Sequence, residues 1–109
     1  MTTKKVSART GSRYWLTYDL GIRGDYESLY EWLDQQHAVE CGDSVATFVS
    51  RKSADEIKKE LAAILGTEKR SRVYLISGRA HKGQFLIGGR KSAPWAGFAL
   101  ASQASGSDE

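Results

Sequence analysis

A carboxylate closes the first aromatic segment of the sequence, and its position gives it two possible roles. Residues 14–19 (YWLTYD) are rich in types that favour β-strands, and Asp19 ends the segment just before Leu20 and Gly21. A carboxylate placed there can ligate a metal ion and take part in catalysis. It can equally accept hydrogen bonds from the amides of the following loop, as aspartates do in Asx turns. The sequence leaves both roles open.

Basic residues are segregated along the chain, although the formal net charge is only +3. Residues 1–18 carry four bases and no acid, and residues 19–68 carry eleven acids against five bases. Residues 69–107 carry seven bases and no acid. Clustered Lys and Arg gain affinity for polyanions by displacing counterions from phosphates. This pattern predicts a surface that faces a polyanion, with a solvated surface of acidic helices and basic loops as the alternative.

Five cations are candidates for nucleic-acid binding. Four lie in the basic C-terminal third of the chain and one lies in the loop that follows the first strand. They are Arg79, Lys82, Arg90, Lys91 and, in the loop, Arg23. For the loop residue, simple solvation is the alternative.

Several other kinds of site are excluded by composition. Cys41 is the only cysteine, and together with the distant His37 and His81 it makes no zinc ligand set. A lone cysteine permits no intrachain disulfide and is typical of a cytoplasmic protein. No glycine pattern matches a nucleotide-binding loop, so no small-molecule cofactor is indicated. The apolar runs are too short to span a bilayer, and no secretory signal is recognisable. We therefore expect a cytoplasmic protein without a membrane segment.

The elements that position these residues follow from the hydrophobic periodicity. It predicts strands at 14–19, 37–41, 45–50 and 72–77, and helices at 25–36 and 53–65. This order predicts an α+β domain with a ferredoxin-like βαββαβ topology, in which both helices cover one face of a four-stranded antiparallel sheet. Residues 84–88 are a candidate for an extra C-terminal strand at the edge of a dimer.

The length of 109 residues suits one domain. We expect this domain to occupy residues 13–100. The polar residues 1–12 then form a flexible N-terminal segment, and the low-complexity residues 101–109 form a disordered tail.

A sheet covered by helices on one side leaves its other face open. Alternation along the first strand puts Leu16 and Tyr18 on one face, and Trp15, Thr17 and Asp19 on the other. If the helices cover the first group, Trp15 lies on the uncovered face. A large aromatic side chain is poorly placed there in a monomer. We therefore expect Trp15 and Thr17 to lie in an interface with a partner subunit or a ligand.

Short motifs spread over residues 13–98 carry a resemblance to a known family. They are Tyr18-Asp19-Leu20, Asp25-Tyr26, Leu29-Tyr30, Ser44-Val45-Ala46-Thr47-Phe48 and Trp95-Ala96-Gly97-Phe98. Together they resemble the small CRISPR-associated dimeric nucleases with a ferredoxin-like fold, and most of all their stand-alone relatives labelled SinR family.

The resemblance implies a homodimer in which two open sheet faces meet. In the nucleases, the aspartate that closes the first strand lies near the dimer interface, and Asp19 matches that position. The pair is proposed to hold a divalent metal for phosphodiester cleavage. The resemblance therefore implies a Mg²⁺-dependent nuclease acting on RNA or DNA, in which the metal orients a water and neutralises the scissile phosphate.

The chain also departs from this family. Stand-alone relatives often carry acids between the second helix and the fourth strand, where this chain has Lys69, Arg70 and Arg72. These bases favour a polyanion partner and carry no information about cleavage. The alternative function is a non-catalytic antitoxin-like or regulatory module, in a defence or toxin-antitoxin setting, that binds nucleic acid or a protein. The fold does not decide between the two.

Overall fold

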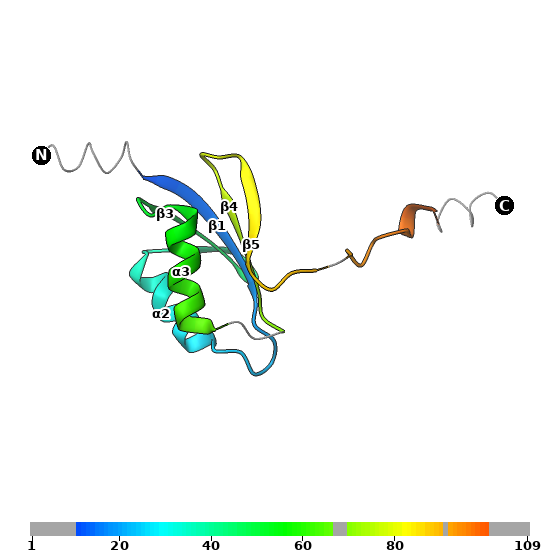
Figure 1. The fold of residues 1–109 in the computed structure, drawn as a ribbon, viewed down its shortest axis with the longest axis horizontal. Helices are drawn as coiled ribbons and strands as arrows, with labels where there is room; N and C mark the ends of the chain where they lie inside the picture. The colour runs from blue at the N-terminus through cyan, green and yellow to red at the C-terminus, as the bar shows by residue number, and fades with distance from the viewer. Residues whose placement is uncertain (1–10, 67–69, 91, 101–109) are drawn as a thin grey trace, which may run out of the picture.

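The computed structural model describes residues 11–66, 70–90 and 92–100. The fold is α+β, as predicted (Figure 1). Its elements are β1 (Ser12–Asp19), α2 (Tyr26–Gln35), β2 (Val39–Gly42), β3 (Val45–Ser50), α3 (Ala54–Leu65), β4 (Arg72–Ser77) and β5 (Lys82–Ile87). Most of the predicted terminal segments, 1–12 and 101–109, lies outside the described residues, and β1 already begins at Ser12.

The sheet has five strands in the order β2-β3-β1-β4-β5, and every neighbouring pair is antiparallel. The prediction of a four-stranded sheet is therefore wrong. The candidate extra strand forms a hairpin with β4, in which Tyr74 lies opposite Phe85. Because β5 pairs with the polar backbone groups of β4, it takes the edge position that β4 would otherwise occupy.

Both helices pack on the same face of the sheet, where they form one hydrophobic core with it (Figure 1). The apolar stripe of α2 contributes Leu29, Trp32 and Leu33, and that of α3 contributes Ile57 and Leu61. These side chains meet the inward-facing residues of the strands. The strand residues of this core are Tyr14, Leu16, Tyr18, Ala46, Phe48, Val73, Leu75, Leu86 and Ile87.

The predicted caps explain where the helices begin and end. Asp25 caps α2 by accepting a hydrogen bond from the Ser28 amide at 3.0 Å. Ser53 and Glu56 form the predicted capping box at the start of α3, in which each side chain accepts from the other residue's amide. Gly66 ends α3 with a φ of 74°, a conformation that favours glycine.

The other side of the sheet carries no helix, and we call it the open face. The burial pattern of β1 confirms the predicted orientation, since Tyr14, Leu16 and Tyr18 are buried while Trp15 and Thr17 are only half-buried. Cross-strand pairing places further apolar and threonine residues on the same side. The apolar, aromatic and threonine residues of the open face are Trp15, Thr17, Val39, Val45, Thr47, Val49, Tyr74, Ile76 and Phe85, and the charged residues Arg13, Asp19 and Arg72 lie on the same side.

Residues 92–100 extend away from the sheet and helices (Figure 1). Trp95 and Phe98, which belong to one of the short motifs that carry the expected resemblance, are 73% and 72% exposed. In the described part of the chain, no helix combines the length and the apolar character needed to cross a membrane.

Candidate nucleic-acid interface

Asp19 lies in an open hollow of about 350 Å³ at the end of β1, which we call the Asp19 hollow. The hollow forms on the open face at the end of the sheet that carries the β2–β3 turn. Its polar and aromatic lining comes from several separate elements. Its charged side chains are Asp19, Asp43, Arg72 and Arg90, and its aromatic side chains include Tyr74 and Phe85.

Two contacts fix the Asp19 carboxylate. One oxygen accepts a hydrogen bond from the Gly21 amide at 3.0 Å, the Asx-type contact that the sequence analysis left open. The other oxygen lies 3.7 Å from Nη1 of Arg72, the residue directly opposite Asp19 on β4. The Asp19 side chain is 63% exposed and the Arg72 side chain is 39% exposed, so water screens this ion pair.

These contacts do not fit a magnesium site within one chain. A guanidinium beside a carboxylate opposes the approach of a second cation, and Arg90 adds another positive charge to the same hollow. Among the residues that the structure describes, Asp43 is the only other carboxylate in its lining. Across the described ranges, no group of three or more His, Cys, Asp and Glu side chains could hold a metal ion. A Mg²⁺ site built from two Asp19 residues depends on a dimer and stays a prediction.

Arg90 reaches the Asp19 hollow because the chain turns sharply after β5. Gly88 has a φ of 70°, and a Cβ atom on it would collide with the carbonyl oxygen of Ser71. Only glycine tolerates both conditions at this position without strain. The turn carries the following residues towards the end of β4, where Arg90 joins Arg72.

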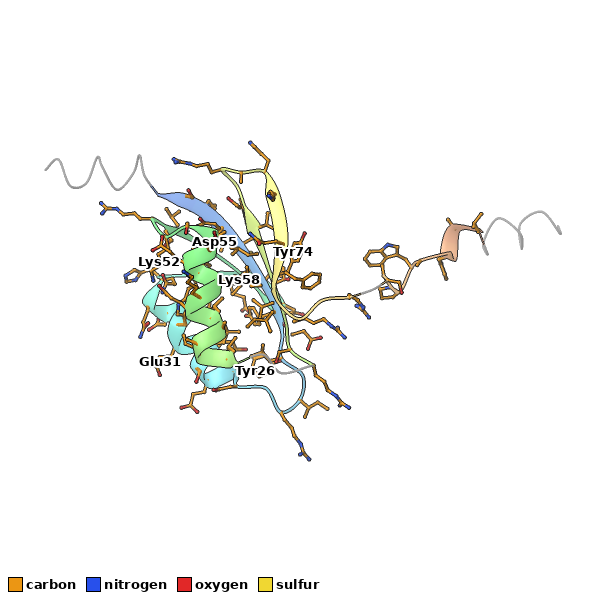
Figure 2. The ribbon with its side chains drawn as sticks, in the orientation of Figure 1. Tyr26, Glu31, Lys52, Asp55, Lys58 and Tyr74 are labelled. Atoms are coloured by element: carbon orange, nitrogen blue, oxygen red, sulfur yellow. The ribbon has the colours of Figure 1, made fainter. Side chains whose placement is uncertain are left out.

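Arg79 and Lys82 lie at the opposite end of the sheet, in and just after the β4–β5 turn. They line a second hollow, of about 490 Å³, together with Arg51 and Lys52. We call these four cations the basic end. Figure 2 shows Lys52 and Asp55 near the N-terminal end of α3, next to this region. Asp55 lines the same hollow. It is the acidic residue closest in sequence to Lys52.

Two of these four cations were absent from the predicted site. Arg51 and Lys52 belong to residues 19–68, in which acids outnumber bases, so the charge pattern did not identify them as part of a basic surface. Pairing of β1 with both β3 and β4 brings the ends of those strands together, since Ser12 lies opposite Ser50 and Tyr14 opposite Ser77. Only this non-local pairing places residues 51–52 beside residues 79–82.

Lys52 also interacts with side chains of both helices. Its Nζ lies 2.8 Å from Oε1 of Glu60, and the same oxygen accepts a 2.8 Å hydrogen bond from Nε1 of Trp32. The hydrogen bond from Lys52 holds the pKa of Glu60 below its usual value, with a further contribution from Trp32, while partial burial opposes the shift. The Tyr14 hydroxyl donates to the Lys52 carbonyl at 2.8 Å, and burial raises the pKa of this phenol. Lys52 therefore anchors the segment that carries Arg51.

The predicted cations therefore do not form one surface. Arg79 and Lys82 come together at the basic end, and Arg90 lies in the Asp19 hollow. Arg23 lies apart from both, in the β1–α2 loop beside a small hollow that it shares with Asp25. Lys91 lies outside the described residues. The predicted interface residues Trp15 and Thr17 lie on the open face, and Thr17 also lines the Asp19 hollow.

No protein-family model, curated protein or solved structure matches this chain. The family resemblance therefore depends on the short motifs alone.

Proposed function

We propose that this protein binds nucleic acid and that its basic end contacts the phosphate backbone. The observation that carries the proposal is the grouping of Arg79 and Lys82 with Arg51 around one hollow of about 490 Å³. These cations come from two separate segments that the sheet brings to one end. Cations arranged in this way attract phosphates and gain affinity through counterion release.

We also propose that the domain is a ferredoxin-like unit with one added strand. The order β2-β3-β1-β4, with both helices on one face, supports the βαββαβ topology expected from the sequence. On this reading β5 extends the unit at the free edge of β4. The topology by itself assigns no activity.

Of the two functions expected from the sequence, the geometry of a single chain supports the non-catalytic binding module better. Asp19 already contacts the Gly21 amide and the Arg72 guanidinium, so its carboxylate has a structural role without a metal. The Mg²⁺-dependent nuclease is the second candidate. It is favoured by one observation, the presence of Asp43 as a second carboxylate in the Asp19 hollow.

The test of the binding proposal measures the affinity for short labelled RNA and DNA over a range of salt concentrations. Each lost phosphate contact should reduce the salt dependence of log K by about 0.7 to 0.9. The double variant Arg79→Gln/Lys82→Gln should therefore bind more weakly and with a shallower slope. Lys58→Gln/Lys59→Gln on the exposed side of α3 removes the same charge and should leave the slope unchanged. Equal loss in both double variants, or no binding by the wild type, would overturn the proposal.

The same oligonucleotides test the nuclease candidate. They are incubated with the wild type and with Asp19→Asn, in Mg²⁺ or in EDTA. We expect no cleavage by either protein in either condition. Cleavage that needs Mg²⁺ and disappears in Asp19→Asn would establish the nuclease and remove the argument for a binding module.

A further inference from the structure

We propose that the Asp19 hollow holds one unpaired base of a single-stranded nucleic acid, with Tyr74 as the stacking surface. This inference rests on the proposed nucleic-acid binding and specifies its substrate class. The basic end holds phosphates of any strand. The Asp19 hollow requires a base that is not paired.

The aromatic part of the hollow comes from Tyr74 and Phe85, which face each other across β4 and β5. Their ring centroids are 4.9 Å apart and their planes lie at 78°, so the two rings stand nearly perpendicular. Tyr74 lies over Gly83, since a Cβ atom on that glycine would come within 2.6 Å of its Cε2. The Tyr74 ring therefore covers the backbone of β5 at Gly83, and the Phe85 ring stands nearly perpendicular beside it.

Neither ring is needed for the core. Phe85 is 39% exposed and Tyr74 is half-buried, and both belong to the open face, opposite the helices. Figure 2 shows Tyr74 among the strands, on the side away from Glu31 and Lys52. Two aromatic rings at nearly right angles offer a base the π-face of one ring for stacking and a contact with the other ring at the edge of the base.

The charged lining suits the remaining parts of a nucleotide. Arg72 and Arg90 can each bind a phosphate through a planar guanidinium, and the ion pair with Asp19 orients Arg72. Asp19 and Asp43 are acceptors for the amino and imino groups on the edge of an unpaired base. A mixture of two cations and two carboxylates would serve neither a metal ion nor a bare phosphate well. A nucleotide carries both kinds of complementary group.

The position of the hollow favours a single strand. The basic end and the Asp19 hollow lie at opposite ends of β1, whose eight residues span roughly 25 Å at the usual rise per residue. Trp15 lies on the open face, whereas the hollow of the basic end lies on the side that the helices cover, since its lining includes Tyr14, Ser77 and the start of α3. A strand that passes from the basic end around the β4–β5 turn and over Trp15 would deliver a splayed base to Tyr74. A duplex keeps its bases stacked and paired, so it cannot fill a hollow of about 350 Å³ in this way.

The experiment compares single-stranded homopolymers with duplexes of the same length for the wild type, Tyr74→Leu and Phe85→Leu. Loss of a stacked base should weaken single-strand binding roughly tenfold without changing its salt slope. Duplex binding should stay unchanged in both variants. Val49→Ala, which truncates an open-face residue outside the hollow, should bind both forms like the wild type. Thermal melting of each variant establishes that it is folded.

The binding results distinguish three ways in which the proposals can be wrong. If the wild type binds neither form, the proposed function itself is wrong. If Arg79→Gln/Lys82→Gln weakens binding while Tyr74→Leu and Phe85→Leu do not, only the base site is wrong. If Tyr74→Leu converts a sedimenting dimer into a monomer and leaves single-strand affinity unchanged, the hollow is covered by a second copy, and the base site is likewise overturned.

Discussion

At the scale of single residues, Asp19 is the clearest case of one side chain with two possible uses. The hydrogen bond from the Gly21 amide, at 3.0 Å, holds the loop that leaves β1, while Arg72 balances the charge. A hydrogen bond of this kind contributes about 1 kcal/mol, and an exposed ion pair contributes about 0.5 kcal/mol. If Asp19 has a structural role, its replacement should destabilise the protein. If it is a strained catalytic residue, its replacement should stabilise the protein.

We expect Asp19→Ala to lower the free energy of unfolding by about 1 to 1.5 kcal/mol. Asp19→Asn keeps an acceptor for Gly21 and loses only the ion pair, so it should cost about 0.5 kcal/mol. Urea unfolding of the three proteins measures both values. A more stable Asp19→Ala would contradict the structural role, because removal of a strained functional residue often stabilises a protein.

Gly83 is a second residue whose identity is dictated by its neighbour. A methyl group there would come within 2.6 Å of Cε2 of Tyr74, so the ring must move in Gly83→Ala. We expect this variant to lose about 1 to 3 kcal/mol of stability, the usual cost of overpacking, and to lose its preference for single strands. Gly89→Ala is the matched control, because a Cβ atom there has no neighbour within 4 Å. Unfolding and oligonucleotide binding are measured on both, and equal behaviour would contradict the position assigned to Tyr74.

At the scale of elements, one carboxylate joins the two helices to the segment that carries Arg51. Glu60 on α3 accepts hydrogen bonds from Trp32 on α2 and from Lys52, both at 2.8 Å. Its pKa is lowered in the folded protein, mainly by the hydrogen bond from Lys52. A lowered folded pKa means that the stabilisation is present above the unfolded pKa of about 4.3 and is lost as the pH falls through the folded pKa.

We therefore expect the stability of the wild type to fall below about pH 5 more steeply than that of Glu60→Gln. The difference at neutral pH should be about 0.5 to 1 kcal/mol, because the Glu60 side chain is 37% exposed and water screens its charge. Denaturant unfolding at a series of pH values measures it. Glu31→Gln on α2 removes the same charge at an exposed position. Parallel pH profiles for the wild type and Glu60→Gln would contradict the assignment.

The elements themselves follow largely from local signals. The capping box at Ser53, the cap at Asp25 and the apolar stripes placed both helices within a residue or two. The weakest prediction was β5, because Lys82–Ile87 shows no regular alternation of buried and exposed residues. A register shift between Val73 and Tyr74 interrupts its pairing with β4. A bulge of this kind breaks the period of two from which a strand is recognised.

At the scale of the whole molecule, the open face is a large and mainly apolar surface whose charged residues, Arg13, Asp19 and Arg72, lie at the ends of β1 and β4. Val39 is 64% exposed and Val49 is 50% exposed, and both lie on the β2–β3 side of Trp15. The Asp19 hollow lies at the other end of β1 from Val49, and its lining includes Val45 on β3 and Asp43 in the β2–β3 turn as well as Tyr74 and Phe85. A second copy that covers Val39 and Val49 without reaching Val45 would leave the hollow accessible, and the predicted homodimer and the proposed base site are then compatible.

The predicted homodimer can be tested by sedimentation over a range of concentrations. We expect the wild type to dimerise and Val49→Lys to shift the equilibrium strongly towards monomer, because a charge buried without a partner is costly. Ile22→Lys is the control, since Ile22 is fully exposed in the β1–α2 loop, away from the open face. A monomeric wild type, or equal dissociation in both variants, would remove the prediction.

The sequence by itself determined the α+β class, the helices and their caps, and which face of β1 the helices cover. Each of these depends on residues within a turn or two of one another. It also identified Asp19, Arg79, Lys82 and Arg90 as candidates, although it did not indicate which of them lie together.

Only the tertiary structure decided the composition of the two hollows. Arg72 meets Asp19, and Arg51 meets Arg79 and Lys82, because strands distant in the sequence pair through β1. Likewise, Gly83 matters only because Tyr74 lies over it from the neighbouring strand. Strand register fixes such contacts, and β1 pairs with strands that are distant in the sequence, so no single local segment determines which side chains meet.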